Sequence, residues 1–285
     1  MTNIVLAFII IPIKLLGENM RFSNLHTHTL FSDGTGGVRE NIESAIQKNM
    51  SSLGISDHSF TACDQTYCMK LENYPRYESV IKELKREYEG KIPVFLGIEK
   101  DFYSETDNER YDYLIASIHY MIRNGEVYAI DHKPEIQMKC INDAFGGSVL
   151  DFAKAYYEMA VLHAEKAKPT FIGHIDVINK FSLMPEDSLE YQKIASEAVA
   201  EIIKYCPVFE VNTGAIARGY RKLPYPAPSI LKSILDFGGE LVLNSDSHRP
   251  ENLDFFFGKS VEIIKAQGFD HILEFTGEGF KKITI

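Results

Sequence analysis

Seven short apolar stretches of this sequence each lead into polar residues, most of which can bind a metal ion or move a proton. In chain order these residues are His26 with His28, His58, Glu99, His119, His174, Asn212, and Asp246 with His248. Imidazole and carboxylate groups together suit zinc, iron or manganese. A carboxylate such as Glu99 has two oxygens and can bridge two ions, and paired ions are a standard device for phosphoester chemistry.

The apolar stretches predict β-strands, and the amphipathic segments between them predict helices. The expected strands are Phe22–His26, Ser52–Ser56, Val94–Ile98, Tyr113–Ser117, Thr170–Gly173, Val208–Asn212 and Glu240–Asn244. The expected helices are Val38–Lys48, Tyr77–Glu89, Val149–Lys166, Leu189–Tyr205, Ser229–Phe237 and Leu253–Gln267. This alternation predicts parallel strands joined by crossover helices. In a closed β/α barrel the carboxyl ends of the strands converge on one face, which would bring the polar residues together.

Each of these short motifs is a weak signal by itself, because single buried histidines are commonly structural. His26 and His28 do face the same side of an extended strand, as two ligands of one ion must. Repetition of such motifs at successive strand ends makes a purely structural role improbable for the whole set. His132, His163 and His271 fall outside the pattern, and we expect surface or structural roles for them.

Two segments interrupt the alternation. Residues Tyr120–Gly147 are rich in charge and are expected to form a long loop-like insertion, and the Tyr67–Arg76 region is expected to be another loop. Long loops in compact domains are often lids or binding loops.

Composition restricts the class of partner. The chain has 285 residues and a formal net charge of -10, and it contains no long lysine or arginine run. Proteins that bind nucleic acid through its phosphates need a basic surface, so we expect no nucleic-acid partner. The net negative charge does not exclude a small phosphorylated substrate, because bound divalent cations supply positive charge locally. The oligomeric state is left open.

The cysteines and the amino terminus bear on location. None of the four cysteines (Cys63, Cys68, Cys140 and Cys206) forms a CxxC pair, which favours free thiols in a reducing cytoplasm. An apolar run at Ile4–Leu16 is too short to span a membrane. We expect residues 1–20 to be an extension that precedes the natural start, with Met20 as the alternative start, and residues 21–285 to form a single barrel domain. A membrane-tethering segment is the rival interpretation.

The ordered motifs resemble those of the polymerase-and-histidinol-phosphatase (PHP) family. The resemblance covers residues 21–260 and includes Asn24-Leu25-His26-Thr27-His28 with Ser32-Asp33-Gly34, Ser56-Asp57-His58, Gly97-Ile98-Glu99, Ser117-Ile118-His119, Gly173-His174-Ile175-Asp176 and Ser245-Asp246-Ser247-His248. It implies an α/β fold, a distorted (β/α)7 barrel with a metal cluster at the carboxyl ends of the strands.

The resemblance also implies three sets of metal ligands for two to three divalent ions of zinc, iron or manganese. The first set is His26, His28, Glu99 and Asp246; the second is Glu99, His119 and His174; the third is Asp33, His58 and His248. Glu99, Asp246 and His248 are the expected catalytic residues, with Asp246 or His248 as alternative proton donors to the leaving oxygen. A hydroxide that bridges the metals would attack phosphorus.

Two stretches, Gly173–Ile178 and Glu210–Pro226, resemble the histidinol phosphatase branch of the family. They imply hydrolysis of L-histidinol phosphate to L-histidinol and phosphate, a reaction of histidine biosynthesis. Arg218 is the expected phosphate clamp, with Arg221 and Arg249 as weaker candidates, and Lys180 stands where the family commonly has arginine. Lysine acts there as a point charge and not as a two-pronged donor.

Two other functions stay open. A PHP phosphatase could act on phosphotyrosine or another small phosphoester. A small nuclease is a further hypothesis, and the lack of a basic track in the sequence weakens it. A metal-binding module without catalytic activity is the less favoured reading, because the ligand set is complete.

Overall fold

The computed structural model describes residues 20–285, and its centre is a parallel sheet that curves into a barrel. The sheet has the order β1-β2-β3-β4-β7-β8-β9, with parallel pairing between all neighbours. The strands are β1 (Ser23–Asn24), β2 (Ser52–Ile55), β3 (Val94–Asp101), β4 (Tyr113–Ser117), β7 (Phe171–Ile172), β8 (Val208–Asn212) and β9 (Glu240–Asn244). The expectation about an amino-terminal extension concerns residues 1–19, which lie outside the described part of the chain.

The first and last strands approach each other just beyond their carboxyl ends. Thr27 and Ser247 form a parallel bridge, and the backbone N–H of His28 donates to the carbonyl of Ser247 at 2.8 Å. The amide oxygen of Asn244 also accepts from the N–H of Leu25 at 2.7 Å. The sheet is therefore a nearly closed seven-stranded barrel, which confirms the expected fold class.

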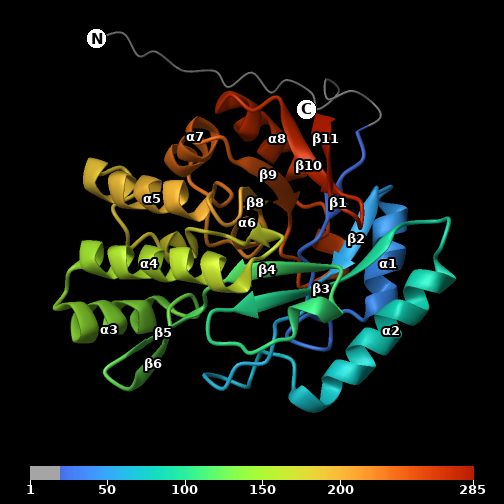
Figure 1. The fold of residues 1–285 in the computed structure, drawn as a ribbon, viewed down its shortest axis with the longest axis horizontal. Helices are drawn as coiled ribbons and strands as arrows, with labels where there is room; N and C mark the ends of the chain where they lie inside the picture. The colour runs from blue at the N-terminus through green and yellow to red at the C-terminus, as the bar shows by residue number, and fades with distance from the viewer. Residues whose placement is uncertain (1–19) are drawn as a thin grey trace, which may run out of the picture.

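Helices cover the outside of the barrel (Figure 1). They are α1 (Val38–Gln47), α2 (Tyr74–Glu87), α3 (Pro134–Phe145), α4 (Val149–Ala167), α5 (Leu189–Ile202), α6 (Gly214–Ala217), α7 (Pro228–Asp236) and α8 (Phe257–Ala266). Short 3-10 turns lie at η1 (Leu71–Asn73), η2 (Asn108–Arg110), η3 (Val177–Asn179) and η4 (Pro250–Asn252). Apolar faces of the long helices pack with the outward side chains of the strands in one large core.

The expectation of a loop over Tyr120–Gly147 is wrong. This segment forms a hairpin of β5 (Tyr120–Arg123) and β6 (Glu126–Ala129), followed by α3. Asn124 and Gly125 turn the hairpin with φ angles of 53° and 79°, the left-handed conformation that an Asn-Gly pair adopts readily. Pro134 begins the helix, and Gly146 ends it with a φ of 58°. The last helix also starts later than expected, at Phe257 in place of Leu253.

The barrel interior at the amino ends of the strands is filled with aromatic and aliphatic side chains. Tyr113 lies against Gly54 and Gly97, where a Cβ atom would come within 2.2 Å and 2.1 Å of its ring or hydroxyl, so only glycine leaves room for it. A hairpin of β10 (His271–Phe275) and β11 (Phe280–Thr284) places Phe275 against Phe95, with ring centroids 5.0 Å apart. This hairpin closes the amino end of the barrel.

Candidate active site

The opposite end of the barrel carries all nine of the predicted metal ligands. His26 and His28 follow β1, His58 follows β2, and Glu99 lies inside β3, which runs past the expected end at Ile98 to Asp101. Most of these side chains are buried, with Asp33 and His248 the more exposed members. The ligand atoms gather into four overlapping groups that could each hold an ion: His28, Asp33, His58 and His248; His26, His28 and Asp246; His26, Glu99 and His174; His58, Glu99 and His119.

The first predicted ligand set comes together. Nε2 of His26 lies 3.3 Å from Oε1 of Glu99 and 3.8 Å from Oδ1 of Asp246. Nε2 of His28 lies 3.1 Å from the same Asp246 oxygen and 3.6 Å from Oε2 of Glu99. Asp246 has a φ of 48°, a left-handed backbone conformation that aspartate adopts more readily than most residues.

The second predicted set shares the Glu99 carboxylate with the first. Oε1 of Glu99 lies 3.0 Å from Nε2 of His174 and 3.4 Å from Nε2 of His119. Glu99 is thus surrounded on both of its oxygens by imidazole nitrogens, which is the arrangement that a carboxylate bridging two cations requires.

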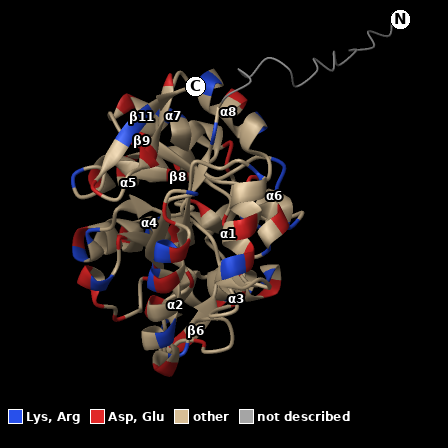
Figure 2. Ribbon diagram, turned by 90° about the vertical axis from the view of Figure 1, so that its right-hand side faces the viewer, with Lys and Arg blue, Asp and Glu red and all other residues tan. Residues whose placement is uncertain are grey.

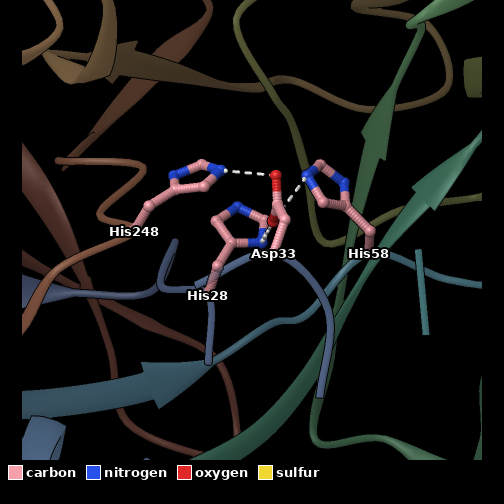
Figure 3. Close-up of side chains that lie close together, drawn as sticks. All are labelled: His28, Asp33, His58 and His248. Carbon is pink, nitrogen blue, oxygen red and sulfur yellow. Dashed lines mark ion pairs between the residues drawn. The ribbon is translucent and has the colours of Figure 1, made fainter. Parts of the chain in front are cut away.

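The third predicted set converges on Asp33 (Figure 3). Oδ2 of Asp33 lies 3.2 Å from Nε2 of His248, and Oδ1 lies 3.6 Å from Nε2 of His58. His28 also faces this group, with Nδ1 at 3.9 Å from Oδ1 of Asp33, which the sequence motifs did not indicate. The other ring nitrogen of His58 lies 2.7 Å from Oε2 of Glu99, so His58 connects this group to the bridging carboxylate.

The donor set fits divalent ions. Nε2 of His26 and Nδ1 of His28 are fully buried, and neither finds a hydrogen-bond partner among residues 20–285. A buried polar atom without a partner destabilises a fold, so these atoms are expected to bind something else. Clustered imidazole nitrogens and carboxylate oxygens are the ligands of zinc, iron and manganese. Several such ions fit the overlapping groups.

Two carboxylates behind the ligands were not predicted to have a role. Glu210 in β8 accepts a hydrogen bond from Nδ1 of His26 at 2.7 Å and another from the backbone N–H of His174 at 2.9 Å. Asp101 contacts Nδ1 of His119 at 3.3 Å. Carboxylates in this position fix the tautomer and orientation of a metal-binding histidine. Alternation along β8 places Glu210 on the same side as Asn212, and that period of two could have revealed it.

Asp57 holds the loop that carries Asp33. Its buried carboxylate accepts hydrogen bonds from the backbone N–H and the hydroxyl of Thr29, both at 2.8 Å, and from the N–H of Ser32 at 3.1 Å. Burial raises the pKa of Asp57, and these hydrogen bonds oppose that rise. The residue before His58 therefore has a structural task next to the candidate ligand.

Six of the candidate ligands line a cavity of about 290 Å³, namely Asp33, His58, His119, His174, Asp246 and His248. A larger hollow of about 1100 Å³ lies beside α2, and it contains none of the predicted site residues. The residue types in its wall therefore identify the smaller cavity as the candidate active site. The rest of its wall is Asp64, Thr66, Tyr67, Tyr120, Ala129, Asp131, His132, Val177, Lys180, Arg218, Tyr220 and Tyr225.

Both predicted phosphate-binding residues line this cavity. Arg218 donates to Oδ2 of Asp246 at 2.9 Å and to Nδ1 of His248 at 3.1 Å. Lys180 donates to the backbone carbonyl of Asp131 at 2.6 Å, and its Nζ lies 3.4 Å from the carboxylate of that residue. The two cations therefore approach the ligand cluster from its rim.

The two weaker arginine candidates lie elsewhere. Arg221 is held by both carboxylate oxygens of Glu186, at 2.7 Å and 2.9 Å, and by the carbonyl of Asn179. Arg249 is exposed and lies 3.8 Å from Glu251. Neither residue lines the cavity of about 290 Å³.

One histidine that was assigned no part in the site also lines the cavity. His132 is exposed but forms part of the cavity wall, because the unpredicted hairpin of β5 and β6 carries the following turn over the barrel. His163 is buried, with Nε2 at 2.9 Å from the carbonyl of Lys100, and His271 is paired with Glu240 near the chain end. The last two thus have the structural and surface roles expected of them.

The two central carboxylates remain ionised. Burial would raise the pKa of Glu99, but the surrounding histidines hold it well below its usual value. Burial would likewise raise the pKa of Asp246, and Arg218, His26 and His28 hold it well below its usual value. Two ionised carboxylates among imidazoles make a site that attracts cations.

Comparisons with known proteins agree with this chemistry. The PHP domain model matches residues 24–214, and the chain therefore belongs to the PHP family. A protein of Deinococcus radiodurans named "Probable histidinol-phosphatase" is 30% identical over 259 residues, which cover 86% of this chain and 93% of that protein.

Two solved structures share the fold. A crystal structure of a Listeria monocytogenes protein aligns with a TM-score of 0.72 and 21% identity, over 83% of this chain and 99% of that one. The histidinol phosphate phosphatase of Lactococcus lactis, crystallised with zinc, L-histidinol and phosphate, aligns with a TM-score of 0.67 and 20% identity, over 92% of this chain and 99% of that one.

Charged residues of both signs lie on the outer helices. Figure 2 shows basic and acidic residues interspersed along the outer helices in that view. Within residues 20–285, none of the helices has the length and apolar character needed to cross a membrane.

Proposed function

We propose that this protein hydrolyses L-histidinol phosphate to L-histidinol and inorganic phosphate. The observation that carries the proposal is the buried Glu99 carboxylate, whose two oxygens lie within 3.6 Å of the nitrogens of His26, His28, His58, His119 and His174. The choice of ester is supported by the curated relative named as a histidinol-phosphatase and by the Lactococcus lactis enzyme that holds L-histidinol and phosphate.

The residues of the chain divide between holding ions and holding the substrate. Eight of the nine predicted ligands would hold two or three divalent ions, which when bound neutralise phosphate oxygens and lower the pKa of water, and the ninth, His248, would serve as the proton donor. Arg218 would donate its guanidinium N–H groups to the phosphate, because it already lies at the edge of the cluster and carries a fixed charge. Lys180 would supply a second positive charge from the same cavity wall.

Asp246 and His248 are the two predicted proton donors to the leaving oxygen, and we assign this role to His248. Arg218 and the nearby histidines keep Asp246 ionised, so it is a poor proton donor. His248 lines the cavity and receives a hydrogen bond from Arg218 on Nδ1, which leaves Nε2 facing Asp33 and the cavity.

We assign the protein to the cytoplasm, because its four cysteines are free thiols in the structure.

Phosphate release from L-histidinol phosphate tests the proposal. The purified protein would be assayed with added zinc or manganese, and again after treatment with a chelator, with phosphotyrosine as the comparison substrate. We expect fast release that the chelator abolishes and that exceeds the release from phosphotyrosine by at least about 100-fold, the discrimination that a few polar contacts supply. Equal or faster release from phosphotyrosine would move the function to the other phosphoester.

A further inference from the structure

Tyr225 lines the cavity and carries a buried hydroxyl group that has no partner in the described part of the chain. The residue is 1% exposed, and its hydroxyl finds no hydrogen-bond partner among the described residues. Tyr225 nevertheless forms part of the cavity wall. Tyr67 also lines the cavity with an unpaired hydroxyl, but that residue is partly exposed.

The aromatic ring of Tyr225 is fixed from several sides. Its backbone N–H and carbonyl pair with Asn212 at the end of β8, at 2.9 Å and 2.8 Å. Its ring lies edge-on to His174 with centroids 6.3 Å apart, and the Arg221 guanidinium lies 5.2 Å from its centroid. The position of the hydroxyl is therefore determined by the barrel, since neither the backbone nor the ring is free to turn.

Several other buried tyrosines have hydroxyls that form hydrogen bonds within the protein. Tyr113 donates to the carbonyl of Leu25 at 2.6 Å, Tyr77 donates to the carbonyl of Gly97 at 2.8 Å, and Tyr157 pairs with the hydroxyl of Tyr191 at 2.9 Å. A buried hydroxyl without a partner is destabilising, so phenylalanine would be the more stable choice at position 225 if packing were the only demand. The unpaired group at the cavity wall indicates a partner that arrives with a ligand.

The surroundings of Tyr225 favour a negatively charged ligand group. Arg218 and Lys180 line the same cavity as Tyr225, together with Asp131, which pairs with Lys180. A tyrosine hydroxyl keeps its proton at neutral pH and can donate it in a hydrogen bond. Hydrogen bonds between a neutral donor and a charged acceptor are stronger than those between neutral groups.

We propose that the Tyr225 hydroxyl donates a hydrogen bond to a phosphate oxygen of the substrate. This inference rests on the proposed function only in assuming that the ligand carries a phosphate group, and it does not depend on which alcohol is esterified. Tyr225 would then be a substrate-binding residue that complements the charge of Arg218 with a directed neutral donor.

The test is a Tyr225→Phe variant, compared with Tyr157→Phe as the matched control. Both tyrosines are 1% exposed, but the Tyr157 hydroxyl has a protein partner and the residue is not in the cavity wall. Each metal-loaded protein would be titrated with inorganic phosphate, and separately with L-histidinol, in a calorimeter. Thermal unfolding of each variant would be measured alongside.

For Tyr225→Phe we expect phosphate to bind about 10- to 100-fold more weakly, the factor that corresponds to one hydrogen bond to a charged group. We expect its melting temperature to stay the same or rise, and its affinity for L-histidinol to stay the same. Tyr157→Phe is expected to melt at a lower temperature with its phosphate affinity unchanged.

Unchanged phosphate binding by Tyr225→Phe, or a loss of stability equal to that of Tyr157→Phe, would overturn the inference and make the hydroxyl structural. Weaker binding of L-histidinol with unchanged phosphate binding would overturn it as well, because the contact would then be with the alcohol. If wild-type protein fails to hydrolyse L-histidinol phosphate but Tyr225→Phe still weakens phosphate binding, the proposed function fails and this inference stands.

Discussion

The two ends of the barrel are built from the same seven strands but have opposite chemistry. At the amino end, Tyr113, Phe95 and Phe275 pack against one another, and the hairpin of β10 and β11 closes the opening. At the carboxyl end, Glu99 and its histidine neighbours fill the opening with polar atoms, several of which lack protein partners.

This difference separates stability from function. The apolar end gains free energy from burial alone, whereas the polar end keeps buried groups whose partners must come from outside the chain. Substitutions at the polar end should therefore change activity more than stability, and substitutions at the apolar end should do the reverse.

The largest effect is expected for Glu99→Ala. Loss of the carboxylate that contacts both predicted ion positions should lower kcat/KM by roughly 1,000-fold or more, because the chemistry depends on paired ions. The barrel should remain folded, because Glu99 is not part of the apolar core that packs the strands against the helices. Activity, circular dichroism and the metal content of the purified variant would be measured together.

Glu197→Ala supplies the control for this variant, because the Glu197 side chain is 67% exposed on α5 and far from the cluster in sequence and structure. Near-normal turnover by a folded Glu99→Ala protein would refute the scheme of bridged ions.

Phe275→Ala tests the apolar end. Phe275 is 5% exposed and its ring lies against Phe95, Tyr113 and Phe280. Removing it should lower the free energy of unfolding by about 3–5 kcal/mol, as for other buried phenylalanines. Below the melting transition, kcat/KM should stay within about twofold of wild type, because additivity holds for distant sites.

Urea unfolding and activity assays would measure these two quantities. The exposed Phe237, at 48%, provides the control, and Phe237→Ala should change stability little. A large fall in activity of folded Phe275→Ala protein would mean that the two ends are coupled, contrary to the comparison.

Glu210→Gln sharpens the comparison, because Glu210 lies between the two ends and touches no predicted substrate position. The amide cannot accept as strongly from Nδ1 of His26, so the orientation of that ligand is loosened. We expect metal affinity or activity to fall about 10- to 100-fold, the usual effect of losing such an outer partner. Metal titration with a chelator as competitor would measure the affinity, and activity restored by excess metal would identify a positioning role.

The smallest expected effect is the pH dependence that Asp176 contributes. Burial raises the pKa of Asp176 to about 6, although the nearby Arg221 guanidinium opposes the rise. A carboxyl with a raised pKa in the folded state favours folding when protonated, so its contribution is lost as pH rises through the folded-state pKa. Between pH 5 and about pH 6.5 this should lower stability by about 1 kcal/mol, with little further change at higher pH.

Unfolding free energies of wild type and Asp176→Asn at several pH values would test this. The variant should lose that part of the pH dependence, because its amide does not titrate. A variant whose pH profile parallels that of wild type would show that other groups cause the dependence.

The candidate ligands could be proposed from the sequence because they follow apolar strands with short, regular motifs, and the structure brings their side chains together. The strands Tyr113–Ser117, Val208–Asn212 and Glu240–Asn244 were predicted with their observed bounds. Prediction was poorer at Tyr120–Gly147, where the charged composition indicated a loop. There the Asn124-Gly125 turn and Pro134 specified a hairpin and a helix, and only the assembled structure shows the hairpin contributing Tyr120 and Ala129 to the cavity wall.

Residues Glu210, Asp57 and Tyr225 could not be assigned a task from the sequence. Each acts through contacts with residues distant along the chain, such as the bond from His26 to Glu210 across 184 positions. Such contacts depend on the closure of the barrel between β1 and β9. Sequence periodicity gives no information about the distance between residues on separate strands.

The sequence by itself determined the alternation of strands and helices, and with it the residue types that stand at the strand ends, because strand and helix periodicity are local properties of the chain. Tertiary structure alone decided which ligand atoms share a position, which carboxylates orient them, and which hydroxyl remains unpaired at the cavity. Those outcomes require angstrom-scale distances between separate strands, and these distances follow from packing of the whole barrel.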